Sequence, residues 1–265
     1  MNEVIGTLVL HSVENGICRI VLNRPEVANA IAAAQREAII GLLEQAGRDS
    51  AVRVVVLASN GKHFCSGADI EAIAEGGLRA GEAMQRIMNG AQRLVAAVLD
   101  CGKPVIAAVQ GTAAGLGAHL AFACDLVVAA EEAGFIEIFV RRGLTVDAGG
   151  AYLLPRLVGV QKAKELVFFG DKVSARDAHA LGLVNRVVAD AELAATVDAL
   201  AARLATGPTT AISLAKRLIN KSLDTDRGNA FLEEAMAQEV NSRSEDATEG
   251  VKAFIERRTP QFKGY

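Results

Sequence analysis

The stretch KPVIAAVQGTAAGLGAHLAFACD, from Lys103 to Asp125, decides the fold of this chain. Its apolar run from Val105 to Val109 has the composition of a buried strand. The run ends in a glycine-rich turn between Gly111 and Gly117, and a helix of small residues is expected after it. A turn of this kind leaves free backbone N–H groups where the helix begins. The stretch therefore predicts a strand–turn–helix unit that can hold a developing negative charge.

The rest of the first half alternates strand-like and helix-like segments. Strands are expected at Ile17 to Leu22, Val52 to Ala58 and Asp125 to Ala129, because these short runs are rich in β-branched residues. Helices are expected at Asn29 to Arg48 and Gly81 to Leu99, where apolar residues recur at helical spacing. This alternation predicts an α/β fold with a largely parallel sheet.

The second half is mainly helical after about residue 155. Three amphipathic helices are expected at Pro208 to Leu223, Arg227 to Ser242 and Asp246 to Arg257. The spacing from Asp246 to Glu249 is that of a capping box for the last helix. We therefore predict an α/β core over residues 1–200 and a helical oligomerisation region over residues 201–265, whose apolar faces bury on a partner subunit.

Composition excludes several classes of function. The hydrophobic share of 51% supplies a sizeable core for 265 residues, which is the size of one large domain. Aromatics make up 4% and Trp is absent, which argues against a platform for stacking bases. The net charge of -3 argues against a general nucleic-acid binder.

The cysteine pattern predicts a reducing compartment. Cys18, Cys65, Cys101 and Cys124 form no CxxC pair, so we expect free, buried thiols, a cytoplasmic protein and no metal site. No apolar stretch reaches about 18 residues without a polar interruption, so no membrane span is expected.

Five segments, in this order along the chain, resemble the crotonase superfamily, also called the enoyl-CoA hydratase/isomerase family. They are LNRPEVANAI (Leu22 to Ile31), FCSGADI (Phe64 to Ile70), the opening stretch, Gly170 to Val188, and Phe254 to Gly264. The resemblance implies a crotonase-like spiral of β-β-α units with a C-terminal helical trimerisation region, assembled as a homotrimer or as a hexamer of two trimers. It implies an acyl-CoA thioester as substrate; coenzyme A is part of that substrate, and no separate cofactor is expected.

The resemblance also implies site residues. Two backbone N–H groups, of Ala68 and Leu116, are expected to form an oxyanion hole for the thioester oxygen, with the Leu116 side chain pointing away from it. Asp69 is also expected to shape its own loop. For Arg24, Arg258 and Lys263 the alternative is a surface charge that stays in solvent. Substrate-binding positions implied by the matching segments are Arg24, Ala28, Ser66, Asp69, Gly115, Phe139, Arg258 and Lys263.

The chain departs from the family where hydratases carry two glutamates. His119 stands at the first of these positions and Phe139 at the second, and a phenyl ring holds neither water nor a proton. Glu137 would share the face of Phe139 on a strand but not on a helix. His119 is either an acid/base group or a helix histidine that fills the space of the missing glutamate. Glu71 stands where many relatives carry a lysine near CoA.

Asp147, in the sequence VDAGG, is the remaining acidic candidate. Isomerases of this family carry an aspartate in a similar context, and one carboxylate suffices to move a proton along an acyl chain. Burial beside Phe139 and Leu144 would raise its pKa. The alternative is that Asp147 caps the helix expected near Gly149; the two roles do not exclude each other.

Three functions are compatible with these residues. The first is an acyl-CoA double-bond isomerase that uses Asp147 as proton carrier. The second is an enoyl-CoA hydratase with an altered pair that includes His119. The third is a non-catalytic acyl-CoA binding protein. A thiol nucleophile at Cys65, next to His63, is disfavoured because nothing nearby in the sequence indicates a depressed thiol pKa.

Overall fold

The computed structural model describes residues 7–69 and 79–265. The strands are β1 (Val9–Glu14), β2 (Ile17–Leu22), β3 (Val54–Ser59), β4 (Val105–Val109), β5 (Thr112–Ala114), β6 (Leu126–Ala130), β7 (Gly134–Ile136), β8 (Lys172–Ser174) and β9 (Arg186–Val188). A main sheet has the order β1-β2-β3-β4-β6-β9, and a small second sheet has the order β5-β7-β8. Among the described strands of the main sheet, β1 alone pairs antiparallel with its neighbour. This confirms the predicted α/β fold with a largely parallel sheet.

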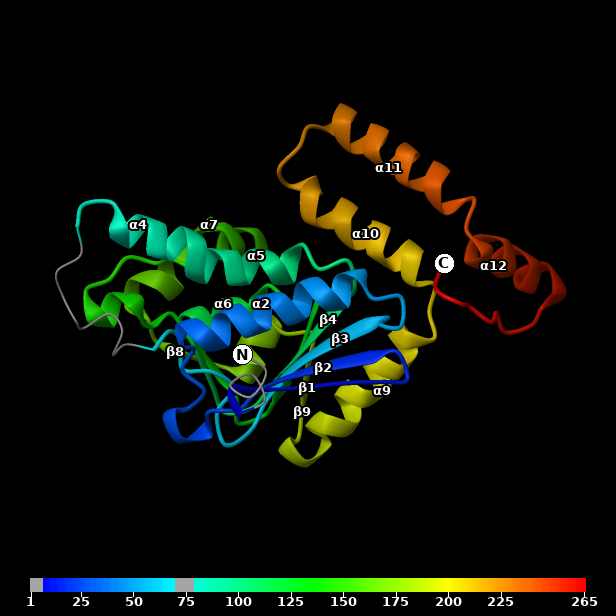
Figure 1. Ribbon diagram of the computed structural model, residues 1–265. Helices are drawn as coiled ribbons and strands as arrows, with labels where there is room; N and C mark the ends of the chain where they lie inside the picture. Colours follow the sequence, from blue (N-terminus) through cyan, green and yellow to red (C-terminus); the bar gives the residue numbers. More distant parts are fainter. Residues whose placement is uncertain (1–6, 70–78) are drawn as a thin grey trace.

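Helices enclose the main sheet. They are α2 (Ala33–Arg48), α4 (Glu82–Arg86), α5 (Arg93–Leu99), α6 (Leu116–Phe122), α7 (Gly150–Phe169), α8 (Ala175–Ala180), α9 (Leu193–Ala205), α10 (Thr209–Ser222), α11 (Arg227–Asn241) and α12 (Glu245–Glu256). Figure 1 shows α2 and α5 above the sheet and α9 below it, where α9 contacts β2, β3, β4 and β6. Because β3 and β4 are apolar along their length and covered in this way, they form the centre of the core.

Two boundaries differ from the prediction. The helix expected from Asn29 begins at Ala33, because Asn29 has a left-handed backbone and its buried side chain donates to the carbonyls of Asn60 and His63. The glycine-rich turn after β4 contains the short strand β5, which the sequence did not predict. Both deviations bring chain segments together at the edge of the sheet where β4 ends.

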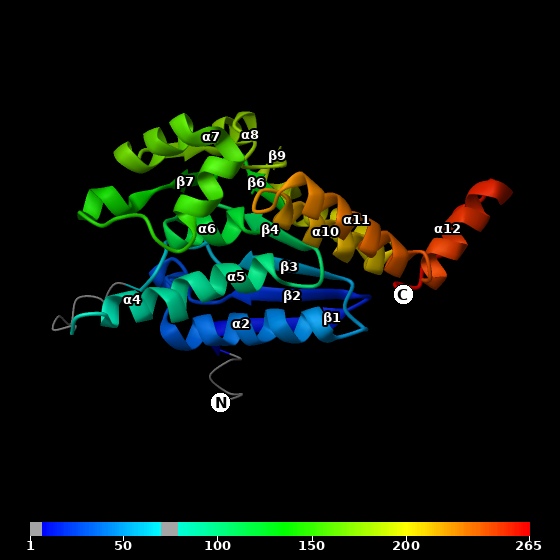
Figure 2. The same cartoon turned by 90° about the horizontal axis from the view of Figure 1, so that it is seen from above.

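The three C-terminal helices match their predicted positions, but the predicted cap of the last one is wrong. Ser244 is the N-cap of α12, and its hydroxyl accepts from the Ala247 amide. Asp246 instead accepts from the amides of Lys263 and Gly264, which fastens the end of the chain to α12. Figures 1 and 2 show α11 and α12 projecting away from the sheet layers. The domain division at residue 200 stays a prediction, since α9 spans it and packs on the sheet.

The four cysteines are free and buried, as predicted. In the part of the chain that is described, no helix combines the length and the apolar character needed to cross a membrane.

A buried ion pair fastens α10 to the core. Lys216 Nζ lies 2.8 Å from Asp125 Oδ2 and also donates to the carbonyls of Val98 and Lys103. Asp125 also accepts from the Val105 amide at 2.7 Å, so it holds the start of β4. From the sequence we had expected Asp125 to cap the strand that follows it, which is β6. Burial raises the pKa of the Asp125 carboxyl, and the Lys216 ammonium opposes that rise.

We predict that Lys216→Met lowers the free energy of unfolding by about 3–5 kcal/mol, because it leaves the Asp125 carboxylate buried without its cation. The matched control is Lys162→Met, which removes an exposed pair with Glu165 and should cost less than about 1 kcal/mol. Urea unfolding measures both variants. Equal losses for the two would contradict the anchoring role of Lys216.

Candidate active site

A parallel pairing brings the FCSGAD loop against the turn after β4. The Cys65 amide donates to the Thr112 carbonyl at 3.1 Å, and the Ala114 amide donates to the Cys65 carbonyl at 2.9 Å. The loop therefore runs alongside β5. Gly67, next to Ala68, lies close to the start of α6, because a Cβ on it would be 3.8 Å from the Leu116 backbone nitrogen.

Two backbone N–H groups in this region have no hydrogen-bond acceptor among the described residues. The Leu116 amide is in the first turn of α6, where amides have no partner within the helix. Among the described residues neither this amide nor that of Ala68 donates a hydrogen bond. The Leu116 side chain is 4% exposed and belongs to the hydrophobic core, so it points away from the loop, as predicted.

Two glycines make this approach possible. A Cβ on Gly117 would lie 2.3 Å from the Cys65 carbonyl oxygen, so only glycine lets α6 pack on the loop. Gly115 has φ +51°, a conformation that side chains rarely adopt, and a Cβ there would lie 3.2 Å from Ile138. The close contact between the loop and the turn therefore depends on the absence of side chains.

His119 lies one turn further along α6 and is fully buried. Its Nε2 is 2.9 Å from Glu137 Oε2, and its ring stacks on Phe139 with centroids 5.5 Å apart. Its Nδ1 is buried and has no hydrogen-bond partner among the described residues. His119 is therefore bonded through Nε2, while its Nδ1 has no partner among the described residues.

Glu137 restores a carboxylate that the substitution at Phe139 removed. It directly follows β7 and precedes a 3₁₀ turn, Ile138–Arg142, and its side chain is 5% exposed. The sequence left open whether Glu137 and Phe139 share a face. In the structure both side chains contact His119, Phe139 through its ring and Glu137 through its carboxylate.

Asp147 lies half-buried in the loop before α7. Burial raises the pKa of its carboxyl, and the neighbouring His119 opposes this rise. The predicted cap is wrong, because Gly149 is the N-cap of α7 and no side chain bonds to the first turn there. The Asp147 backbone carbonyl accepts from the Gly150 amide, and a Cβ on Gly150 would lie 2.3 Å from Cε1 of His119. The turn that carries Asp147 is thus packed directly against the His119 ring.

The chain belongs to a known family. The sequence model described as "Enoyl-CoA hydratase/isomerase" matches residues 12–265. This is the enoyl-CoA hydratase/isomerase family, the crotonase superfamily that the five segments predicted.

Relatives and solved structures cover almost the whole chain. A protein of Rhodobacter capsulatus named "Probable enoyl-CoA hydratase" is 38% identical over 97% of this chain and 98% of its own. The 1,2-epoxyphenylacetyl-CoA isomerase of Escherichia coli is 39% identical with the same coverage of both chains. The crystal structure of an enoyl-CoA hydratase from Bacillus anthracis superimposes with a TM-score of 0.91 at 33% identity, over 97% of this chain and 100% of that one.

Arg24 and Asp69 of this enoyl-CoA hydratase/isomerase family member bind each other. Arg24 Nη1 donates to Asp69 Oδ2 at 2.9 Å and to the Ala30 carbonyl at 2.8 Å. Asp69 thus shapes its loop, as expected, and the Arg24 charge is already paired. In the same loop the Ser66 amide donates to the carbonyl of Ala28, which has a left-handed backbone. Ser66 and Asp69 belong to the loop that carries Ala68, and these hydrogen bonds tie Ala28 and Arg24 to it. The contact of all four residues with substrate stays a prediction.

Arg258 and Lys263 lie with α12, apart from this site. Arg258 binds both carboxylate oxygens of Glu249 and also Glu256, and Lys263 Nζ lies 3.0 Å from Glu245. Figure 1 shows α12 at the end of the molecule away from α6, and the contact of these two cations with substrate stays a prediction. Glu71, and the first residues of the segment from Gly76 to Leu99 expected to line the acyl pocket, lie outside the described residues.

Sequence reasoning missed Asn29, which is fully buried and organises the loop. Besides its two donated bonds, its Oδ1 accepts from the Arg24 amide at 2.8 Å. The signal was the Asn-Arg-Pro…Asn segment itself. The thiol of Cys65 is no nucleophile, because burial raises its pKa to about 12, and His63 Nδ1 accepts from the Thr112 amide.

We predict that Gly117→Ala destabilises the protein by about 1–3 kcal/mol, because the new methyl group forces α6 away from Cys65. The Gly41→Ala variant is the control, since a Cβ on Gly41 of α2 would meet nothing within 4 Å. This control should be neutral or stabilising by up to about 1 kcal/mol. Thermal and urea unfolding compare the two. A Gly117→Ala protein as stable as the control would refute the close approach.

Proposed function

We propose that this protein is an acyl-CoA double-bond isomerase in which Asp147 carries the proton. The observation that supports this most is the state of the Asp147 carboxyl. It is half-buried, its pKa is raised by burial, and its side chain caps no helix. A carboxylate with a raised pKa is a better proton acceptor at neutral pH than an ordinary aspartate.

The oxyanion hole is the second part of the proposal. The unbonded amides of Ala68 and Leu116 would donate to the thioester oxygen as an enolate forms. Two preorganised donors stabilise that charge more than the neutral carbonyl, and losing one typically costs about 2.7–4 kcal/mol of barrier. Asp147 would remove a proton from the acyl chain and return it to another carbon of the same chain. This sequence of steps uses no cofactor beyond the CoA of the substrate.

The names of relatives support an isomerase without excluding a hydratase. The Escherichia coli relative is named an isomerase of 1,2-epoxyphenylacetyl-CoA, and a Streptococcus mutans relative, 31% identical, is named trans-2-decenoyl-[acyl-carrier-protein] isomerase. The Rhodobacter capsulatus relative is named a hydratase. One observation favours hydration as a second candidate: the pair of His119 and Glu137 is an acid/base unit that could orient water. A binding protein without activity is the third outcome of the assay below.

We predict that the wild type converts 3-enoyl-CoA thioesters and that Asp147→Asn lowers this rate by about 100-fold or more, because general-base catalysis contributes about 10²–10⁴-fold. The control Asp171→Asn removes an exposed carboxylate that pairs with Arg141, and its rate should stay unchanged. A parallel assay on 2-enoyl-CoA measures hydration. Full activity in Asp147→Asn would exclude Asp147 as the base, and binding without turnover of either ester would favour a binding protein.

The pH profile tests the same carboxylate. A base must be ionised, so kcat/KM should rise with pH as Asp147 loses its proton. Because burial raises the pKa of Asp147, the midpoint of the rise should lie above the ordinary aspartate value. This acidic limb should be absent from any residual activity of Asp147→Asn.

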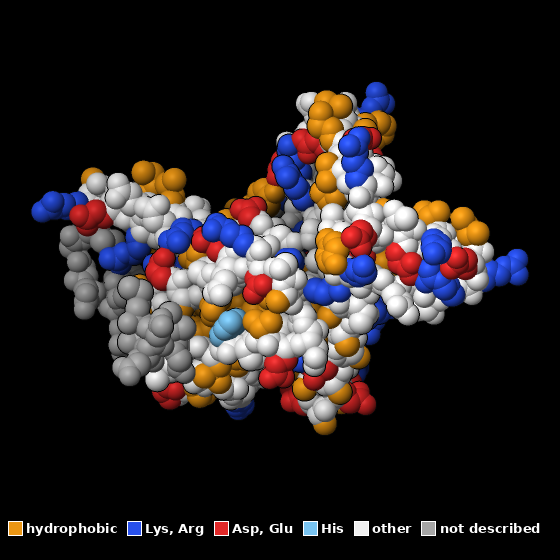
Figure 3. All heavy atoms as spheres, turned by 45° about the vertical axis from the view of Figure 1, so that its right-hand side comes forward, with side chains coloured by type: hydrophobic (Ala, Val, Ile, Leu, Met, Phe, Trp, Pro, Cys, Tyr) orange, Lys and Arg blue, Asp and Glu red, His pale blue; other side chains and the backbone are white. Residues whose placement is uncertain are grey.

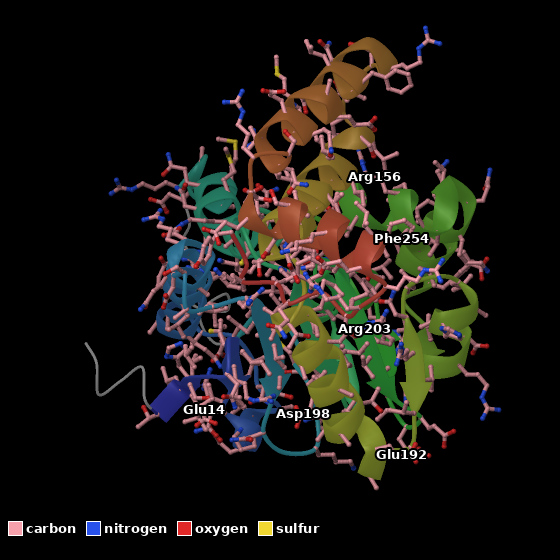
Figure 4. The ribbon with its side chains drawn as sticks, turned by 90° about the vertical axis from the view of Figure 1, so that its right-hand side faces the viewer. Glu14, Arg156, Glu192, Asp198, Arg203 and Phe254 are labelled. Atoms are coloured by element: carbon pink, nitrogen blue, oxygen red, sulfur yellow. The ribbon has the colours of Figure 1, made fainter. Side chains whose placement is uncertain are left out.

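We also propose that the C-terminal helices form a subunit interface, in a trimer or a pair of trimers. Large apolar side chains on α11 and α12 are exposed, among them Phe231, Met236, Val240 and Phe254, which is 86% exposed. Figure 3 shows apolar side chains on the projecting helices, and Figure 4 shows Phe254 on α12. Exposed apolar area of this extent is typical of a surface that another subunit covers.

We predict that Phe254→Asp lowers the oligomeric state, because a carboxylate in an apolar interface is costly. The control is Arg243→Asp. Arg243 is exposed just before α12, and the variant keeps this position polar. Sedimentation or light scattering should report a trimer or hexamer for the wild type and the control, and smaller species for Phe254→Asp. A monomeric wild type would overturn the interface.

A further inference from the structure

The pair of His119 and Glu137 is enclosed far more completely than Asp147. The His119 side chain is 0% exposed and that of Glu137 is 5% exposed, with 2.9 Å between Nε2 and Oε2. An ionised carboxylate can only accept hydrogen bonds. If Glu137 accepts, the hydrogen bond is donated by Nε2 of His119, and this is the tautomer that the proposal below assigns.

This arrangement determines what the other ring nitrogen can do. A neutral imidazole with its proton on Nε2 has an unprotonated Nδ1 that can only accept. In His119 this atom is buried and finds no partner among the described residues. A buried polar atom is rarely left without a partner, so an unpaired one in a ligand-binding layer points to a group that arrives with the ligand.

The surroundings place that nitrogen at the proposed site. The His119 ring stacks on Phe139 on one side and contacts the backbone of Gly150, which is bonded to Asp147. His119 also follows Leu116 by one turn of α6. The ring, whose Cε1 and Nε2 atoms lie nearest Gly150, therefore belongs to the same layer as the turn that carries Asp147 and the first turn of α6.

We propose that Glu137 is a positioning residue that holds His119 in the Nε2–H tautomer, so that Nδ1 is a second proton-accepting group beside Asp147. The inference rests on the proposed function in one respect only, that the acyl group binds in this layer. Glu137 itself touches no substrate and acts through the imidazole, as the carboxylate does in a hydrolase triad.

The tautomer is tested first, in the protein without ligand. Nitrogen-15 NMR of histidine-labelled protein distinguishes protonated from bare ring nitrogens, and His119→Gln assigns the signal. The chain supplies two references. His63 Nδ1 accepts from the Thr112 amide and must be bare, whereas His179 Nδ1 lies 2.7 Å from the Val184 carbonyl and must carry a proton.

The expected result is that His119 resembles His63, with a bare Nδ1 and a protonated Nε2. In Glu137→Leu the His119 signals should move toward a mixture of tautomers, while those of His63 and His179 stay unchanged. A wild-type His119 with a protonated Nδ1 would overturn the proposal, whatever the activity of the protein. If Glu137→Leu does not fold, Glu137→Gln takes its place in the spectrum.

Kinetics test the role in the reaction. We expect Glu137→Gln to lower kcat for 3-enoyl-CoA at least about tenfold with KM changed less than about twofold, since the carboxylate that orients an imidazole contributes up to about 10⁴-fold in hydrolase triads. Glu165→Gln, at an exposed pair with Lys162, is the control and should retain the wild-type kcat.

The two proposals fail in different ways. An unchanged kcat in Glu137→Gln, with activity still lost in Asp147→Asn, would overturn the positioning role and leave the isomerase intact. Full activity in Asp147→Asn with a large loss in Glu137→Gln would overturn Asp147 as the base and retain the pair. A rise in KM alone in Glu137→Gln would show that Glu137 only shapes the binding site.

Discussion

The contact between α6 and the Cys65 carbonyl is the constraint on which the site depends. Gly117 has no side chain, and its Cα can therefore lie against the loop that carries Ala68. The two β5 hydrogen bonds fix the loop in register. Without this approach the amides of Ala68 and Leu116 would belong to separate parts of the surface. The glycine-rich turn thus acts through packing as much as through its own conformation.

Next to this contact, His119, Glu137 and Phe139 form one buried cluster. Phe139 removes a carboxylate from its position, and Glu137, two residues earlier, supplies one to His119. The phenyl ring then stacks on the imidazole and encloses it. Burying either polar partner alone would be costly, whereas the pair satisfies the Nε2 proton and the carboxylate together. The Glu137 carboxylate and the Phe139 ring therefore both hold the same side chain, His119.

Local signals were enough to predict most of the fold. Strands β2, β3, β4 and β6 of the main sheet and the helices α10 to α12 came from periodicity within short windows, whereas β1 and β9 were not predicted. What failed depended on distant partners: Asp246 binds the amide of Lys263, 17 residues away, so Ser244 caps α12 instead. Strands of three residues, such as β5, carry too little pattern to be recognised. The pairing of His119 with Glu137 joins two elements 18 residues apart and could not be read from either one.

Asp147 and His119, the two proposed acid/base groups, differ in their exposure to solvent and therefore in whether they can exchange protons with it. The side chain of Asp147 is half-buried and reaches solvent. Among the described residues, the His119 ring is fully buried. A hydratase must bring in a water molecule for each turnover. An isomerase returns to its substrate the proton that it took, and it needs neither water nor exchange with solvent. The enclosed imidazole next to the turn of the half-buried carboxylate therefore supports the proposed proton transfer along an acyl chain over the addition of water.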